Sequence, residues 1–186
     1  MTDAIITKIH SEYVDISGYL LEAKQITFHS DLERYFRKVF ILSIASQYEA
    51  QIQEILLEFV SHKSANSAEL LSFFRKKAIS MNYHTFFDWG KKDKIEEPGA
   101  NANTFFALFG DEFKRVAIEE VRKCQILEAG IKAFLELGHI RNILVHSNFA
   151  AYPFENKTIS EIMELKTKAD IFVLYIRSKL LSVPAE

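Results

Sequence analysis

Residues 138–148 read GHIRNILVHSN, a stretch that places an arginine, an amide and a histidine inside an otherwise apolar run. The guanidinium of Arg141 can hold phosphate oxygens at neutral pH, and His146 can take up and release protons there. The aliphatic residues between them are typical of a packed helix and not of a loop. The stretch therefore predicts a helix that carries chemically capable polar side chains.

Apolar residues at three- and four-residue steps continue on both sides of this stretch and through most of the chain. They predict helices over residues 3–24, 30–59, 66–74, 111–121, 124–149 and 158–180. Three of these helices begin with a capping-box pattern, at Ser30 with Glu33, Asn66 with Glu69, and Thr158 with Glu161. We expect an all-α fold, a helical bundle of about five or six helices.

The helical pattern breaks between about residues 82 and 103. A charged run from Lys91 ends there in the turn signal Pro98-Gly99. Neither side of this segment has the pattern of a separate core. We therefore expect one domain over residues 1–186, with a loop-rich insertion at about 82–103.

Composition narrows the class of protein further. The 186 residues include 16 Phe but only 6 Gly and 3 Pro, which favours long helices over a turn-rich β fold. The formal net charge of −2 exerts no overall attraction on nucleic acid or anionic lipid. Cys124 is the single cysteine, so no disulfide forms within the chain, and no apolar run is long enough to span a membrane. We expect a cytoplasmic protein without membrane partners.

The geometry of an ideal helix separates the polar residues of the central stretch. His139, Asn142 and His146 fall within about 60° of one another, whereas Arg141 lies about 140° from His146. Arg141 and His146 therefore do not share one face of a straight helix. Either the helix end near Ser147 is distorted, or a second copy of the protein completes the site.

Other chemistries find less support in the sequence. His139 and His146 are roughly 10 Å apart along a helix axis, too far for one zinc ion, and no cysteine pair assists. Nothing near Cys124 would lower its pKa, so it is a poor nucleophile. We expect neither a metal nor a cofactor. The structural alternative for Arg141 is an ion pair with a carboxylate.

At these residues the chain resembles the HEPN superfamily, whose mark is an arginine followed by four to six residues and a histidine. Arg141 and His146 have four residues between them, and a polar residue such as Asn142 after the arginine is typical. The resemblance to the RiboL-PSP-type branch also rests on the lead-in FLELG at 134–138 and on Lys157-Thr158, together with four residues of the long helix: Ser43, Ser46, Tyr48 and Glu49.

The resemblance implies a HEPN-like helical bundle and a metal-independent endoribonuclease of the toxin or phage-defence type. His146 would transfer protons, Arg141 would stabilise charge on the phosphorane, and Asn142 would orient His146 or bind phosphate. Two protomers would face each other, and RNA, not DNA, would be the substrate, with tRNA and mRNA both open. The family also leaves room for an antitoxin or regulatory partner. Asn148 stands where nucleotidylated HEPN toxins carry a tyrosine.

Two other functions remain open at this point. A non-catalytic HEPN-like module for dimerisation or partner binding agrees with the near-neutral charge. A helical adaptor would use Arg141 only as an ion-pair partner. The aromatic residues of 86–89 either stack on bases or pack beneath the loop.

Overall fold

The computed structural model describes residues 3–92 and 94–181, and its regular secondary structure in these ranges is helical, apart from one isolated bridge between Gly90 and Pro98. The long helices are α1 (Asp3–Glu22), α2 (Ile26–Lys63), α5 (Asp111–Lys123), α6 (Gln125–His146) and α7 (Ile159–Leu181). The short ones are α3 (Ala68–Phe73), which runs into a π-helical turn (Phe74–Ile79), and α4 (Asn103–Ala107). The prediction of an all-α bundle is confirmed. The short α3 and α4 raise the count above the expected five or six.

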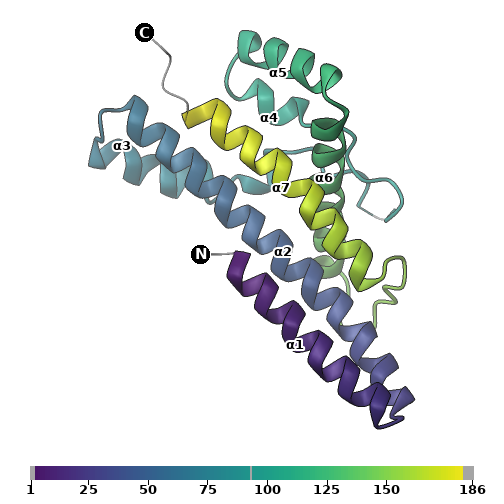
Figure 1. The fold of residues 1–186 in the computed structure, drawn as a ribbon. Coiled ribbons are helices and arrows are strands. Elements are labelled where there is room, and N and C mark those ends of the chain that lie inside the picture. Colours follow the sequence, from purple (N-terminus) through teal and green to yellow (C-terminus); the bar gives the residue numbers. More distant parts are fainter. Residues whose placement is uncertain (1–2, 93, 182–186) are drawn as a thin grey trace.

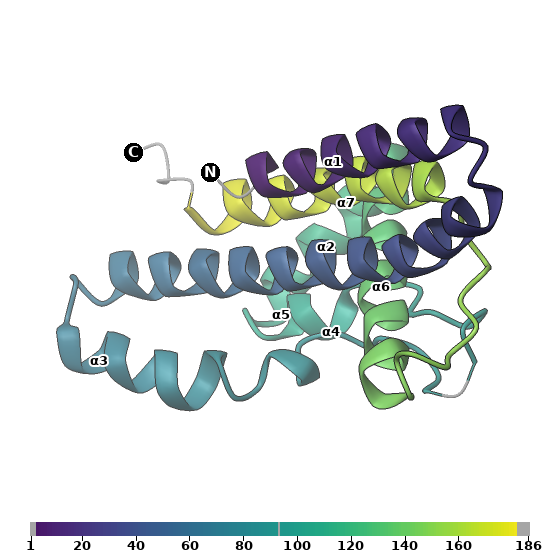
Figure 2. The ribbon, with the colours of Figure 1, turned by 90° about the horizontal axis from the view of Figure 1, so that it is seen from below.

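The 38-residue helix α2 is the axis of the fold, about 57 Å long at 1.5 Å per residue. Figure 1 shows α1 folded back along the first half of α2 and α7 running beside it. Helix α6 packs on α7 so closely that a Cβ atom at Gly130 would lie 2.8 Å from the carbonyl oxygen of Lys168. In Figure 2, α3 and the C-terminal end of α6 lie on the side of α2 opposite α1.

Phenylalanine rings form the centre of the core, where α2, α4, α6 and α7 meet. The rings of Phe87 and Phe105 stack at 4.7 Å, and those of Phe134 and Phe172 meet edge to face at 5.0 Å. Such packed rings contribute more than their buried area alone. The hydroxyl of Tyr48 on α2 lies 2.7 Å from the carbonyl oxygen of Lys166 and so links α2 to α7.

The loop between the π-helical turn and α4 lies against α6. Phe86 and Phe87 are buried there, and the half-buried Trp89 packs on Phe134. These aromatic residues pack beneath the loop and are not free to stack on bases, which decides between the two interpretations of 86–89.

Two of the expected helix starts are wrong. Helix α2 begins at Ile26, so Ser30 lies inside it, and Glu33 accepts a hydrogen bond from Tyr13 of α1 instead of closing a capping box. The cap of α3 is Ser67, whose Oγ accepts from the Leu70 amide at 3.4 Å. Contacts with α1 thus replace the local cap of α2, and Asn66 takes a left-handed conformation just before the cap of α3.

The third capping box is confirmed. The Glu161 amide donates to Oγ1 of Thr158 at 3.2 Å, and the Thr158 amide donates to the Glu161 carboxylate at 2.7 Å. Both donors at the start of α7 are therefore satisfied within four residues.

We expect Gly138→Ala to destabilise the fold by about 1–3 kcal/mol because it overpacks the contact between α6 and the loop. An added Cβ would lie 2.1 Å from Cζ3 of Trp89, whose ring is held by Phe87 at 5.0 Å. Gly18→Ala is the control, since its Cβ would meet nothing within 4 Å. In the interior of α1 it should stabilise by about 0.5–1 kcal/mol. Urea unfolding measures both, and equal stability of Gly138→Ala and wild type would contradict the packing described.

Candidate functional site

The polar residues of the central stretch occupy the last turns of α6. The helix continues without a break to His146, and Ser147 then leaves it in an extended conformation with φ −99° and ψ 169°. Arg141 and Asn142 are half-buried, whereas the side chain of His146 is exposed. The predicted helix over 124–149 is therefore three residues too long at its C-terminus.

Arg141 is held by two oxygen atoms. Its Nη1 donates to Oδ1 of Asn142 at 3.1 Å, and its Nη2 donates to Oε2 of Glu49 on α2 at 3.4 Å. The side chains of Arg141 and Glu49 are 32% and 29% exposed, so water still reaches the pair. Because a guanidinium has five N–H donors, three remain for a ligand.

Tyr83 lies beneath this pair and is almost completely buried. Burial raises the pKa of its phenol far above the ordinary value, and the neighbouring Glu49 carboxylate raises it further. The phenol is therefore neutral at physiological pH. It contributes a low-dielectric floor under Arg141 and Glu49 and adds no charge to the site.

His146 makes no hydrogen bond or ion pair to any residue in the described ranges. Asn142 contacts Arg141 rather than His146, and its Nδ2 has no acceptor within the described part of the chain. No residue of the described ranges thus fixes the His146 ring by a hydrogen bond or ion pair, and within those ranges two polar groups at the end of α6 remain available to a ligand or a partner.

His139 differs from His146 although the spacing places both on one side of α6. Its side chain is only 2% exposed, and Nε2 donates to the carbonyl oxygen of Lys94 at 2.8 Å. The expectation of one polar stripe through His139, Asn142 and His146 is therefore wrong at its first member, because the loop before α4 covers that part of the helix. His139 binds the loop and is not part of an exposed site.

The unbroken helix also bears on how Arg141 and His146 could act on the same atom. Five residues of regular helix place the Arg141 and His146 side chains about 140° apart and about 7.5 Å along the axis. The helix is not distorted before Ser147, so the first alternative is wrong. A second chain, a substrate, or rotation of the long Arg141 side chain, whose Nη1 already reaches Asn142, can bring the two groups to one atom.

Lys38 on α2 is a feature of this region that the sequence analysis missed. It is 1% exposed, and its Nζ donates to the carbonyl oxygen of Phe149 at 2.7 Å and lies 5.3 Å from the centre of the Phe149 ring. Burial, and then the nearby Arg34, lower the pKa of Lys38. The lysine fastens the backbone three residues after His146 to α2.

A signal for Lys38 was present in the sequence. The buried face of α2 repeats at steps of three and four residues, through Lys38, Ile41, Ala45, Tyr48, Ile52 and Ile55. A lysine in register with such a face is buried and needs a polar partner. Glu49 was part of the family resemblance, but only the fold shows that it contacts Arg141.

Comparison with known proteins identifies the family. The RiboL-PSP-HEPN family model matches residues 7–182, which is nearly the whole chain and includes the motif. The chain belongs to the RiboL-PSP-HEPN family. No curated protein and no solved structure gave a significant match.

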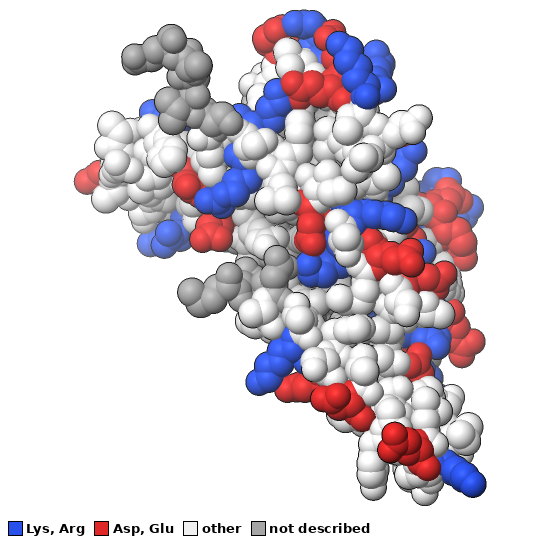
Figure 3. Space-filling view, in the orientation of Figure 1, with Lys and Arg blue, Asp and Glu red and all other residues white. Residues whose placement is uncertain are grey.

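The surface of this HEPN domain has no extended region of one charge on the face shown in Figure 3, where basic and acidic side chains alternate. The sequence has basic runs at 75–77, 91–92 and 122–123. The one at Lys91 is partly compensated, because Glu97 pairs with both Lys91 and Lys94. Within residues 3–92 and 94–181, no three His, Cys, Asp or Glu side chains gather as metal ligands. No helix in these ranges has both the length and the apolar character to cross a membrane.

We expect the stability of this HEPN domain to depend on pH through Lys38. The folded chain holds the Lys38 proton less tightly than the unfolded chain, whose value is the ordinary 10.5. Between the lowered pKa and 10.5 the unfolded state binds more protons, so the free energy of unfolding rises with pH in that window. Lys38→Met keeps an apolar stem without the titration. In urea unfolding at stepped pH, the free energy of unfolding of wild type minus that of Lys38→Met should increase as the pH rises. A difference that stays constant with pH would contradict this account.

Proposed function

We propose that this HEPN domain is a metal-independent endoribonuclease of the toxin or phage-defence effector type, with Arg141, Asn142 and His146 as its catalytic residues. One observation carries the proposal. A guanidinium with free donors and a histidine that no described residue hydrogen-bonds both lie at the accessible end of α6, in the part of the chain that the family model matches. Many HEPN domains are ribonucleases, which supports a nuclease-like function at that coarse level.

The proposed reaction is an in-line attack within the RNA chain. The ribose 2′-oxygen bonds to phosphorus as it loses its proton, and the bond from phosphorus to the 5′-oxygen breaks as that oxygen gains one. His146 would transfer one of these protons. Arg141 would stabilise the charge on the phosphorane, and Nδ2 of Asn142 would donate to a phosphate oxygen. The products are a 2′,3′-cyclic phosphate and a 5′-hydroxyl end.

Glu49 positions Arg141 in this scheme. At 3.4 Å the contact is longer than a strong charge-assisted hydrogen bond, and both groups are about one third exposed. It is therefore weak enough for a phosphate to share the guanidinium. Glu49 would direct the side chain toward the end of α6 without blocking it.

We propose that a second copy supplies the missing half of the site. Four apolar side chains are exposed on the two segments concerned, Val145 (51%) and Phe149 (36%) on one and Tyr35 (45%) and Val39 (36%) on α2. The contact from Lys38 to Phe149 joins these two segments into one surface. Burying such a surface against an identical copy would bring two motifs together around a twofold axis.

A non-catalytic HEPN module is the second candidate. The observation in its favour is the alternation of charges in Figure 3, which offers RNA little long-range attraction. Such a module would use the same surface around Val145 to bind another protein, and His146 would then be a contact residue.

The first test is incubation of the purified protein with total RNA and with tRNA in the presence of EDTA. We expect cleavage under these conditions, with ends that polynucleotide kinase labels at the 5′-hydroxyl directly and that resist 3′ ligation until the cyclic phosphate is removed. A dimeric, folded protein that leaves every RNA intact would favour the binding module. Cleavage that stops in EDTA would contradict the metal-independent reaction.

A further inference from the structure

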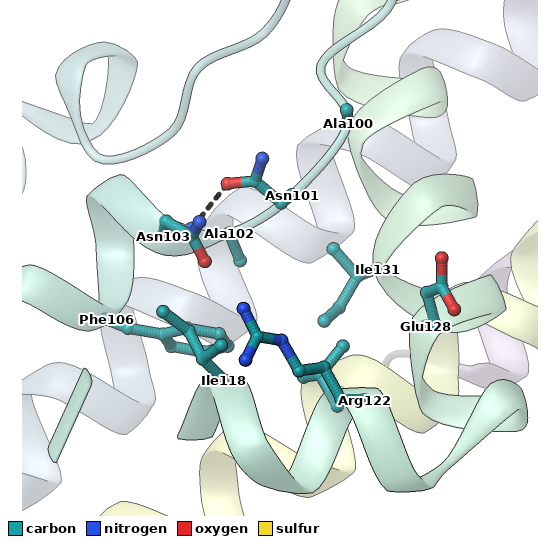
Figure 4. Close-up of a pocket in the computed structure, with 10 residues that line it drawn as sticks. Ala100, Asn101, Ala102, Asn103, Phe106, Ile118, Arg122, Glu128 and Ile131 are labelled. Atoms are coloured by element: carbon teal, nitrogen blue, oxygen red, sulfur yellow. Dashed lines mark hydrogen bonds between the residues drawn. The ribbon is translucent and has the colours of Figure 1, made fainter. Parts of the chain in front are cut away.

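A concave site lies at the other end of α6 from Arg141 and His146. It is a pocket of about 330 Å³ between the loop that leads into α4, the C-terminal half of α5 and the start of α6 (Figure 4). Ile131 in this pocket and His146 are fifteen residues apart on α6, which is about 22 Å along the axis. The pocket is therefore separate from the site at Arg141.

The walls of the pocket are apolar and its rim is polar. Phe106 and Ile131 are almost fully buried and form the floor, and the half-buried Ile118 and Val121 form the wall on α5. The polar lining residues are Asn101, Asn103, Arg122 and Glu128. A few polar groups around an apolar cavity are typical of a small-molecule site, and this volume is near the lower end of such sites.

Arg122 is the lining residue that favours a negatively charged ligand. It lies in the last turn of α5, and Figure 4 shows its guanidinium extended across the pocket between Ile118 and Ile131. In the described residues it makes no hydrogen bond or ion pair. Arg115 of the same helix, by contrast, is engaged by Glu112 and Glu119. A planar guanidinium without a partner matches a phosphate or carboxylate group.

The remaining polar groups suit a flat ring that carries N–H donors. The Glu128 carboxylate already pairs with Lys132 at 2.6 Å, so its charge is compensated, and its other oxygen can accept a hydrogen bond. Oδ1 of Asn101 accepts from the Asn103 amide at 3.0 Å, which leaves its Nδ2 as a donor. Figure 4 draws Asn101 and Glu128 on opposite sides of Ile131, so Glu128 is the acceptor for the N–H edge of such a ring and Asn101 faces a different part of the ligand.

We propose that this pocket binds one nucleoside monophosphate, with the phosphate on Arg122, the base against Ile118 and Val121, and the base edge at Glu128. The proposal does not depend on catalysis at Arg141. The nucleotide can be a free molecule or one nucleotide of an RNA chain, since both present the same groups.

The test is calorimetric titration and thermal unfolding with the four nucleoside 5′-monophosphates and with inorganic phosphate as probes. We expect at least one nucleotide to bind at least about tenfold more tightly than phosphate, and Arg122→Gln to weaken it about tenfold or more, as expected for loss of a bidentate charge-assisted pair. Lys123→Gln is the matched control, because it removes the same charge from the next position and Lys123 does not line the pocket. Its affinity should equal that of wild type.

Two further binding measurements show which site holds the nucleotide and whether the natural ligand is a free nucleotide or RNA. Arg141→Gln should bind the nucleotide as wild type does, and loss of binding in that variant would place the nucleotide in the other site and overturn the proposal. A short 2′-O-methyl oligonucleotide that binds more tightly, and depends on Arg122, identifies RNA as the source; equal or weaker binding identifies the free nucleotide. Failure of all four nucleotides to bind at millimolar concentration, or affinity that does not change in Arg122→Gln, would overturn the proposal whether or not the protein cleaves RNA.

Discussion

His146→Ala is expected to slow RNA cleavage by about 10²–10⁴-fold, the usual contribution of a general acid or base. The fold should be unaffected, because the exposed side chain at the end of α6 makes no hydrogen bond or ion pair within the described ranges. The measurement is the initial rate on a labelled RNA in EDTA, with circular dichroism and urea unfolding on the same preparation.

His139→Ala is the matched control on the same helix. His139 is buried and donates to the Lys94 carbonyl oxygen, so its removal should cost about 1–3 kcal/mol of stability. Below its unfolding transition that variant should still cleave RNA. If His146→Ala unfolds the protein, or cleaves at the wild-type rate, the assignment of His146 fails.

The second large effect is expected from mixing two inactive variants. Arg141→Gln alone should lose about 10²–10³-fold in rate, as when one preorganised donor to a transition-state charge is removed. If each site combines Arg141 of one protomer with His146 of the other, a mixed dimer of Arg141→Gln and His146→Ala contains one intact site. Random pairing would then restore about a quarter of the wild-type activity.

The mixed dimer is best made by co-expression with two different tags and purified by both. The purified heterodimer should have about half of the wild-type rate, since one of its two sites is intact. A heterodimer as inactive as either parent would show that both groups act within one protomer, which the 140° separation on α6 disfavours. A protein that stays monomeric at micromolar concentration would contradict the composite site directly.

Local interactions explain which parts of the fold could be predicted. The start of α7 is a closed exchange of hydrogen bonds between Thr158 and Glu161, so four residues suffice to determine it. The start of α2 is different. Ser17 bonds to His29 at 2.9 Å and Tyr13 donates to Glu33, so α1 extends α2 upstream of the cap pattern at Ser30.

In the candidate site too, local geometry predicted some features, and contacts between distant residues determined the others. The helix and its spacing predicted that Arg141 and His146 do not share a face, because helical geometry depends only on the number of intervening residues. The contact of Arg141 with Glu49 joins positions 92 residues apart, and that of Lys38 with Phe149 joins positions 111 apart. Spacing along the chain carries no information about such pairs.

The sequence by itself therefore determined the helical class, the family motif and the relative angles of its residues, since these follow from local periodicity. Only the tertiary structure decided that His139 is buried under a loop while His146 is exposed, although the two are seven residues apart on one helix. It also decided that Arg122 faces a cavity. The physical reason is that burial depends on which segments cover a helix, and those segments come from distant parts of the chain.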